Sequence, residues 1–171
     1  MTSRKHLIYL KITVFAFLAL TPLSAAGSHS IQQESFRGLN GVFVSVERLD
    51  PLIEQHDLTA EQIRADVASQ IRVAGIRTLS NKEWFDTEGS PYLYVNANIL
   101  KLQETEEYIY SVSISLKQTV YPVRNPIEIS GAATWSTGGI IGITPKLTTI
   151  RDAITGQVKE FIRVYFSVNP K

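Results

Sequence analysis

Polar and apolar residues alternate with a period of two along the middle of the chain. This alternation is typical of strands with one buried face. It predicts strands over Tyr92 to Leu102, Tyr108 to Tyr121 and Ile127 to Trp135. A run of β-branched residues predicts another strand over Val42 to Val46, and Ile76 to Leu79 is a shorter candidate.

A helical spacing of apolar residues begins at Ile63 and continues to Ala74. Thr59 and Gln62 have the spacing of a capping box, and Leu58 with Ile63 has the spacing of a hydrophobic staple. Gly75 suits the left-handed position of a Schellman ending. Because every local signal agrees, this segment is predicted to be a helix.

A second amphipathic segment begins near Thr149 and ends at Asn169-Pro170, with Phe161 on its apolar stripe. A short capping box at Ser80 predicts one helical turn over Asn81 to Asp86. The main elements therefore follow the order β-α-β-β-β-α. This order predicts an α/β two-layer sandwich, with a mixed sheet of four to five strands and two helices on one face.

The predicted domain covers residues 41–171, and residues 27–40 are predicted to be a flexible lead-in because they are polar and lack a period. The segment Gly138 to Ile143 has three glycines among isoleucines without a regular period. It is predicted to be a mobile, exposed loop, and contact with a membrane is left open for it.

Residues 1–26 have the pattern of a secretory signal peptide. A basic start precedes an apolar stretch, Pro22 interrupts that stretch, and small residues lead to a predicted cleavage after Ala26. A membrane anchor is the alternative. It fits less well, because the apolar stretch between Lys11 and Pro22 is shorter than the roughly 20 residues that span a bilayer.

Composition narrows the possible functions further. The chain contains no Cys, which excludes disulfides, thiolate metal sites, a cysteine nucleophile and a lipid anchor on cysteine. Removing Arg4, Lys5 and Lys11 with the signal changes the formal net charge from +1 to −2, which does not favour nucleic acid as a partner. The expected location is the periplasm or the extracellular space, with no transmembrane span after cleavage.

No pattern of catalytic residues is found, and no catalytic, cofactor or metal residue is predicted. His56 lies in Glu54-Gln-His-Asp57 without a second ordered His for a zinc site. Glu104, Glu106 and Glu107 are expected at a solvated hairpin tip. The glycines at 138, 139 and 142 lack the Gly-Lys-Ser/Thr ending of a phosphate loop.

Strand alternation also predicts a nearly uncharged sheet face turned away from the helices. We expect this face to receive a macromolecular partner or a second copy, because interface cores are depleted in charge. A solvated surface is the alternative. Trp84 is expected either to anchor the partner or to fill one end of the core. The candidate partner-binding residues are Trp84, Tyr94, Asn96, Asn98, Ser111, Ser113, Ser115 and Lys117.

The order of elements behind a signal peptide resembles small exported domains of the bacterial envelope. It is similar to the amino-terminal domain of TolB and to the lipopolysaccharide-assembly and curli-secretion lipoprotein families. The matching segments are Val42 to Val46, Val73 to Ile76, Leu93 to Ala97, and Phe161-Ile162. The resemblance implies an exported protein of the bacterial envelope, without fixing its function. Because no nucleophile, base and orienting group converge in the sequence, we expect a non-enzymatic protein that binds a macromolecule, with envelope assembly or secretion as a possible setting. A small-molecule or lipid-binding periplasmic module is the alternative.

Overall fold

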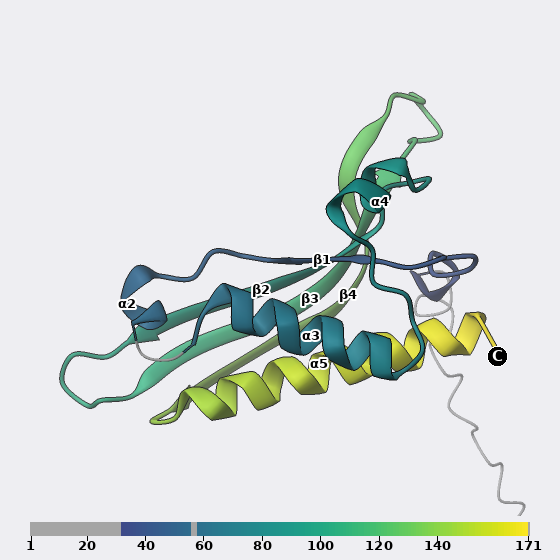
Figure 1. Cartoon of the computed structure of the whole chain (residues 1–171). Helices are drawn as coiled ribbons and strands as arrows, with labels where there is room; N and C mark the ends of the chain where they lie inside the picture. Colours follow the sequence, from purple (N-terminus) through teal and green to yellow (C-terminus); the bar gives the residue numbers. More distant parts are fainter. Residues whose placement is uncertain (1–31, 56–57, 171) are drawn as a thin grey trace, which may run out of the picture.

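Four strands form one mixed sheet in the order β1-β2-β3-β4 (Figure 1). The computed structural model describes residues 32–55 and 58–170. Strand β1 runs parallel to β2, whereas β2 with β3 and β3 with β4 are antiparallel. This arrangement confirms the predicted α/β fold with a mixed sheet. The strands are β1 (Phe43–Val46), β2 (Tyr92–Lys101), β3 (Tyr108–Val120) and β4 (Ile129–Thr144).

Two long helices, α3 (Ala60–Val73) and α5 (Leu147–Val168), lie side by side against one face of the sheet (Figure 1). Two short helices, α2 (Pro51–Glu54) and α4 (Asn81–Asp86), lie on the connections to α3 and β2. Among residues 32–55 and 58–170, no helix is both long enough and apolar enough to cross a membrane.

Helix α3 has the ends that its sequence predicts. The Thr59 side chain accepts from the backbone N–H of Gln62, and the Gln62 side chain accepts from the backbone N–H of Thr59. At the other end Gly75 has a φ of 90°, and the Ile76 N–H donates to the carbonyl of Ile71 over 3.0 Å. Both the capping box and the Schellman ending are therefore confirmed.

The core lies between the sheet and the two long helices. Alternate residues of β2 and β3 point into it, as their period of two predicts. Three aromatic rings fill one end: Phe36 lies 5.2 Å from Trp135 and 5.4 Å from Phe161 between ring centroids. The fully buried side chains include Phe36, Ile63, Ile71, Leu93, Ile114, Leu116, Ile150 and Phe161.

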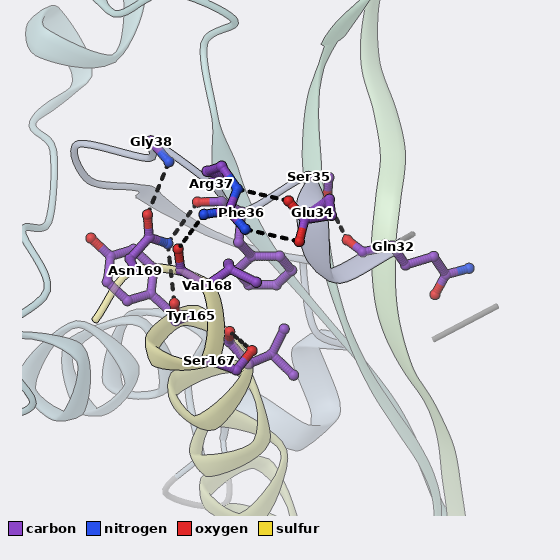
Figure 2. A network of polar contacts seen from close by, with 11 residues as sticks. Gln32, Glu34, Ser35, Phe36, Arg37, Gly38, Tyr165, Ser167, Val168 and Asn169 are labelled. Carbon is purple, nitrogen blue, oxygen red and sulfur yellow. Dashed lines mark hydrogen bonds and ion pairs between the residues drawn. The ribbon is translucent and has the colours of Figure 1, made fainter. Parts of the chain in front are cut away.

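The lead-in predicted over residues 27–40 is corrected for its described part, residues 32–40. Phe36 is 0% exposed in the core. The backbone of residues 36–38 is hydrogen-bonded to Asn169, which follows α5. The Asn169 side chain donates to the Phe36 carbonyl over 2.8 Å and accepts from the Gly38 N–H over 2.9 Å (Figure 2). The Tyr165 hydroxyl donates to the carbonyl of Leu39. These contacts join segments far apart in the chain, so no local pattern could reveal them.

The prediction of a loop over residues 138–143 is wrong, because this segment belongs to β4. Residues 139–144 pair regularly with residues 108–113 of β3. Gly138 has a φ of 74° at a bulge, where residues 137 and 138 lie opposite Ile114. Gly142 leaves room for the Tyr110 ring, which would lie 2.7 Å from a Cβ at this position. Pairing with β3 therefore overrides the weak strand propensity of glycine.

Other element boundaries also differ from prediction, and strands β1, β2 and β3 are each one residue shorter than predicted. Residues 76–79 form only an isolated bridge between Val42 and Thr78. The last strand begins at Ile129 rather than Ile127 and continues to Thr144. Helix α5 begins at Leu147, two residues before the predicted start. The predicted signal peptide lies outside the described residues.

Candidate functional site

The face of the sheet turned away from α3 and α5 is called the outer face here. Register brings its central residues together from β2 and β3: Tyr94 lies opposite Ser115, Asn96 opposite Ser113, and Asn98 opposite Ser111. These side chains alternate with the buried ones and are exposed or half-buried. The structure thus brings seven of the eight predicted residues onto one surface: Tyr94, Asn96, Asn98, Ser111, Ser113, Ser115 and Lys117.

One charged residue, Lys117, lies among the described outer-face positions of β2 and β3. Its Nζ lies 3.7 Å from the centroid of the Tyr94 ring. This is a cation–π contact, which holds the ammonium group down on the face rather than extended into solvent. The Asn98 amide donates to the Asn96 carbonyl oxygen over 2.7 Å. The centre of the outer face is therefore polar, and Lys117 is its one charged residue among the described positions of β2 and β3.

Trp84, the eighth predicted residue, lies at one end of the outer face. Its ring stacks on Phe43 at 5.2 Å and meets Tyr92 edge-on at 5.6 Å. The indole N–H donates to the carbonyl of Ser90 over 2.6 Å. Trp84 therefore does not plug the core between the sheet and the long helices. It forms a half-buried aromatic rim beside Phe85, which is 68% exposed.

The position of Trp84 depends on the start of α4. Ser80 and Glu83 form a complete capping box, as predicted. Hydrogen bonds from the Ser80 backbone N–H and hydroxyl, and then from the Arg77 guanidinium, lower the pKa of Glu83 from 4.5 to about 2. The charged form of Glu83 therefore stabilises the turn that carries Trp84.

The depressed pKa predicts a loss of stability in acid that Glu83→Gln reduces. Glu83 contributes fully above its unfolded pKa of 4.5, and the contribution is lost as the pH falls through about 2. A glutamine side chain at this position also suits the capping box but has no carboxylate to protonate. Urea melts at about pH 5 and about pH 2.5 are expected to show a smaller acid-induced loss in Glu83→Gln than in the parent. Equal losses would show that Glu83 does not contribute to the pH dependence.

The opposite end of the outer face is apolar, and this part was missed from the sequence. Ile143 lies opposite Ile109, which lies opposite Leu100, and Ile141 lies opposite Ser111. Leu100, Ile141 and Ile143 are all exposed. The sequence Ile-Ile-Gly-Ile over residues 140–143 could have revealed them, because its β-branched residues favour a strand. The neighbouring glycines led instead to the prediction of a loop.

The acidic residues considered from the sequence lie around the β2–β3 turn. Glu106 forms an ion pair with Lys101 at 2.9 Å, and its hydrogen bond raises the pKa of Lys101. Glu104 and Glu107 are residues of the connection after β2, as predicted. His56 and Asp57 lie outside the described residues. Within residues 32–55 and 58–170, no three His, Cys, Asp or Glu side chains are grouped to hold a metal ion.

A small hollow between α3 and α5 bears on the alternative of a ligand-binding module. Its cavity volume is about 10 Å³, and its lining includes Ile63, Val67, Gln70 and Ile154. The Gln70 side chain has a buried oxygen without a hydrogen-bond partner. This volume is near the minimum for a single water molecule and far below that of a lipid or drug-sized ligand. Larger hollows of about 420–580 Å³ lie at the surface between α3 and α5, between β1 and α3, and beside Leu147, and they are more open to solvent.

Comparison with known proteins identifies no relative of this chain. No protein-family model, curated protein or solved structure matches the chain. The chemistry of the outer face is therefore the basis for a functional proposal.

Proposed function

We propose that this chain is an exported, non-enzymatic protein of the bacterial envelope that binds a macromolecular partner through the outer face. Envelope assembly or secretion is the proposed setting. The observation that carries the proposal is the outer face itself. It combines an aromatic rim at Trp84, a polar centre around Asn96 and Ser113, and an apolar end at Ile141. Aromatic anchors next to a surface depleted in charge are typical of interfaces.

A surface of this kind ordinarily binds another macromolecule rather than enclosing a small ligand. Ser111, Ser113 and Ser115 are short, so another backbone or sheet can approach closely and exchange hydrogen bonds with their hydroxyl groups. The alternative of a small-molecule or lipid-binding module would need a ligand-sized space between helices and sheet. The more enclosed cavity between α3 and α5 is too small for such a ligand, the core is filled, and the larger hollows are open surface depressions, which favours the macromolecular partner.

Substitution of Ser113 by Arg is expected to weaken association while leaving the fold intact. The long cation stands at the centre of the face and can be hydrated in the free protein, so stability should change within about 0.5 kcal/mol. Cells producing parent or variant are treated with an amine-reactive cross-linker, and the adducts are compared. Arginine adds no reactive amine, so a lost adduct reports lost contact.

Ser69→Arg is the matched control, because Ser69 is exposed on α3 in the opposite layer. It introduces the same side chain away from the outer face. The proposal requires loss of an adduct in Ser113→Arg and its retention in Ser69→Arg. If Ser113→Arg keeps every adduct of the parent, the outer face is only solvated surface.

Export predicts a specific mass for the protein in the producing cell. The basic start, the apolar stretch and the small residues before Gly27 indicate cleavage after Ala26. Intact-mass spectrometry is expected to find a chain that begins at Gly27. Retention of residues 1–26 in most of the protein would contradict cleavage.

A further inference from the structure

Strand β4 forms one edge of the sheet and pairs only with β3 among the described strands. It is 16 residues long, and none of them is charged or proline. Edge strands present unpaired N–H and C=O groups. Natural proteins protect such edges with charge, proline, bulges or a covering element, since an unprotected edge pairs with another chain.

The two halves of β4 differ in this protection. Register shifts interrupt its pairing between residues 129 and 138, and such irregularities twist an edge away from a flat template. Residues 139–144 have no such interruption and pair continuously with residues 108–113. The second half of β4 therefore combines a regular edge with the absence of charge.

The same half of β4 exposes large apolar side chains. Ile141 is 79% exposed, Ile143 is 62% exposed, and Ile140 on the opposite side of the strand is 38% exposed. Ile141 and Ile143 continue the apolar end of the outer face from Leu100 and Ile109 up to the edge. Contiguous exposed apolar surface of this kind is typical of an interaction site.

We propose that residues 139–144 pair antiparallel with the same residues of a second copy of this chain. The two sheets then form one continuous sheet across a twofold axis, and the isoleucines of the two copies share a buried surface. This proposal goes beyond the proposed function, because it concerns the edge of β4 rather than the centre of the outer face.

The absence of charge in residues 139–144 favours a second copy of this chain as the partner of the β4 edge. A twofold interface brings identical surface patches together, so any charge near the axis would meet a like charge. The segment has none, and Lys146 lies beyond its end. In an antiparallel pair centred on the segment, the two lysines are at opposite ends. A uniformly acidic or basic partner would find no complementary charge here.

The test is the mass of the purified protein in solution, measured by light scattering and by sedimentation over a concentration series. The parent is expected to be a dimer. Ile141→Lys places a charge beside the axis, where two copies would repel, and should raise the dissociation constant at least about tenfold. Because Ile141 is largely exposed in the single chain, the variant is expected to fold, and circular dichroism and a urea melt verify this.

Two controls identify the surface. Val123→Lys adds the same charge at a fully exposed position between β3 and β4 and should leave the dimer intact. Ser113→Arg should also leave it intact, because stacking of two outer faces would be broken there while edge pairing would not. A monomeric parent, or a dimer that persists in Ile141→Lys, overturns the proposal. Loss of the dimer in Ser113→Arg would also overturn it and would assign self-association to the outer face.

Discussion

Replacing Phe161 with Ala is expected to lower the free energy of unfolding by about 3–5 kcal/mol. Phe161 is 0% exposed on α5, with its ring 5.4 Å from Phe36 and 6.0 Å from Trp135. Truncation removes apolar surface from the core and leaves a cavity between α5 and the sheet. Such a loss is a large share of the roughly 5–15 kcal/mol that stabilises an ordinary domain.

Lys159→Ala is the matched control for Phe161→Ala. Lys159 is exposed on the same helix, so its removal should change stability within about 0.5 kcal/mol. Urea melts of the parent and both variants measure the difference. Small and equal effects of the two substitutions would show that α5 does not pack on the sheet through Phe161.

Replacing Phe36 with Ala is expected to have an effect of similar size, about 3–5 kcal/mol. Phe36 is 0% exposed, and its ring meets Trp135 edge-on at 5.2 Å. Truncation opens the same end of the core. It also weakens the attachment of residues 36–38 to the end of α5, where Asn169 bonds the Phe36 carbonyl and the Gly38 N–H (Figure 2).

Asn40→Ala is the control within the same segment, because Asn40 is exposed. Denaturant melts should show a much larger loss of unfolding free energy in Phe36→Ala than in Asn40→Ala. Equal losses would show that residues 32–40 are a loosely attached lead-in. The double variant Phe36→Ala with Phe161→Ala adds a second criterion. Because the two rings are in contact, their effects are expected to be non-additive by at least about 0.5 kcal/mol.

The parts of the fold that local chemistry determines could be predicted. Helix α3 is the clearest case, because Thr59, Gln62 and Gly75 act within one turn of the helix ends. Strands β2 and β3 were equally accessible, since a period of two with one buried face is visible in a single segment. Only their end residues differ from prediction.

The parts that distant contacts determine could not be predicted. Phe36 is a lone aromatic in a polar stretch, and its partners lie about a hundred residues away in β4 and α5. Residues 139–144 contain glycines that normally disfavour a strand. They form one because β3 supplies a regular partner and because Tyr110 occupies the space over Gly142.

The candidate site shows the same division. Alternation in β2 and β3 was sufficient to bring Asn96 and Ser113 onto one face. The relation of Trp84 to that face was left open, because it depends on how α4 folds back over Phe43 and Tyr92. The apolar end at Ile141 and Ile143 was missed together with the second half of β4.

Site-specific photo-cross-linking tests most directly whether the outer face receives a partner. A photoreactive phenylalanine analogue replaces Asn96 at the centre of the face in one protein and Ser69 on α3 in another, and each is irradiated in the producing cell. We expect an adduct of defined mass from position 96 that disappears when Ser113→Arg is added, and no such adduct from position 69. The same adduct in equal yield from position 69, or none from position 96, would contradict the proposed function.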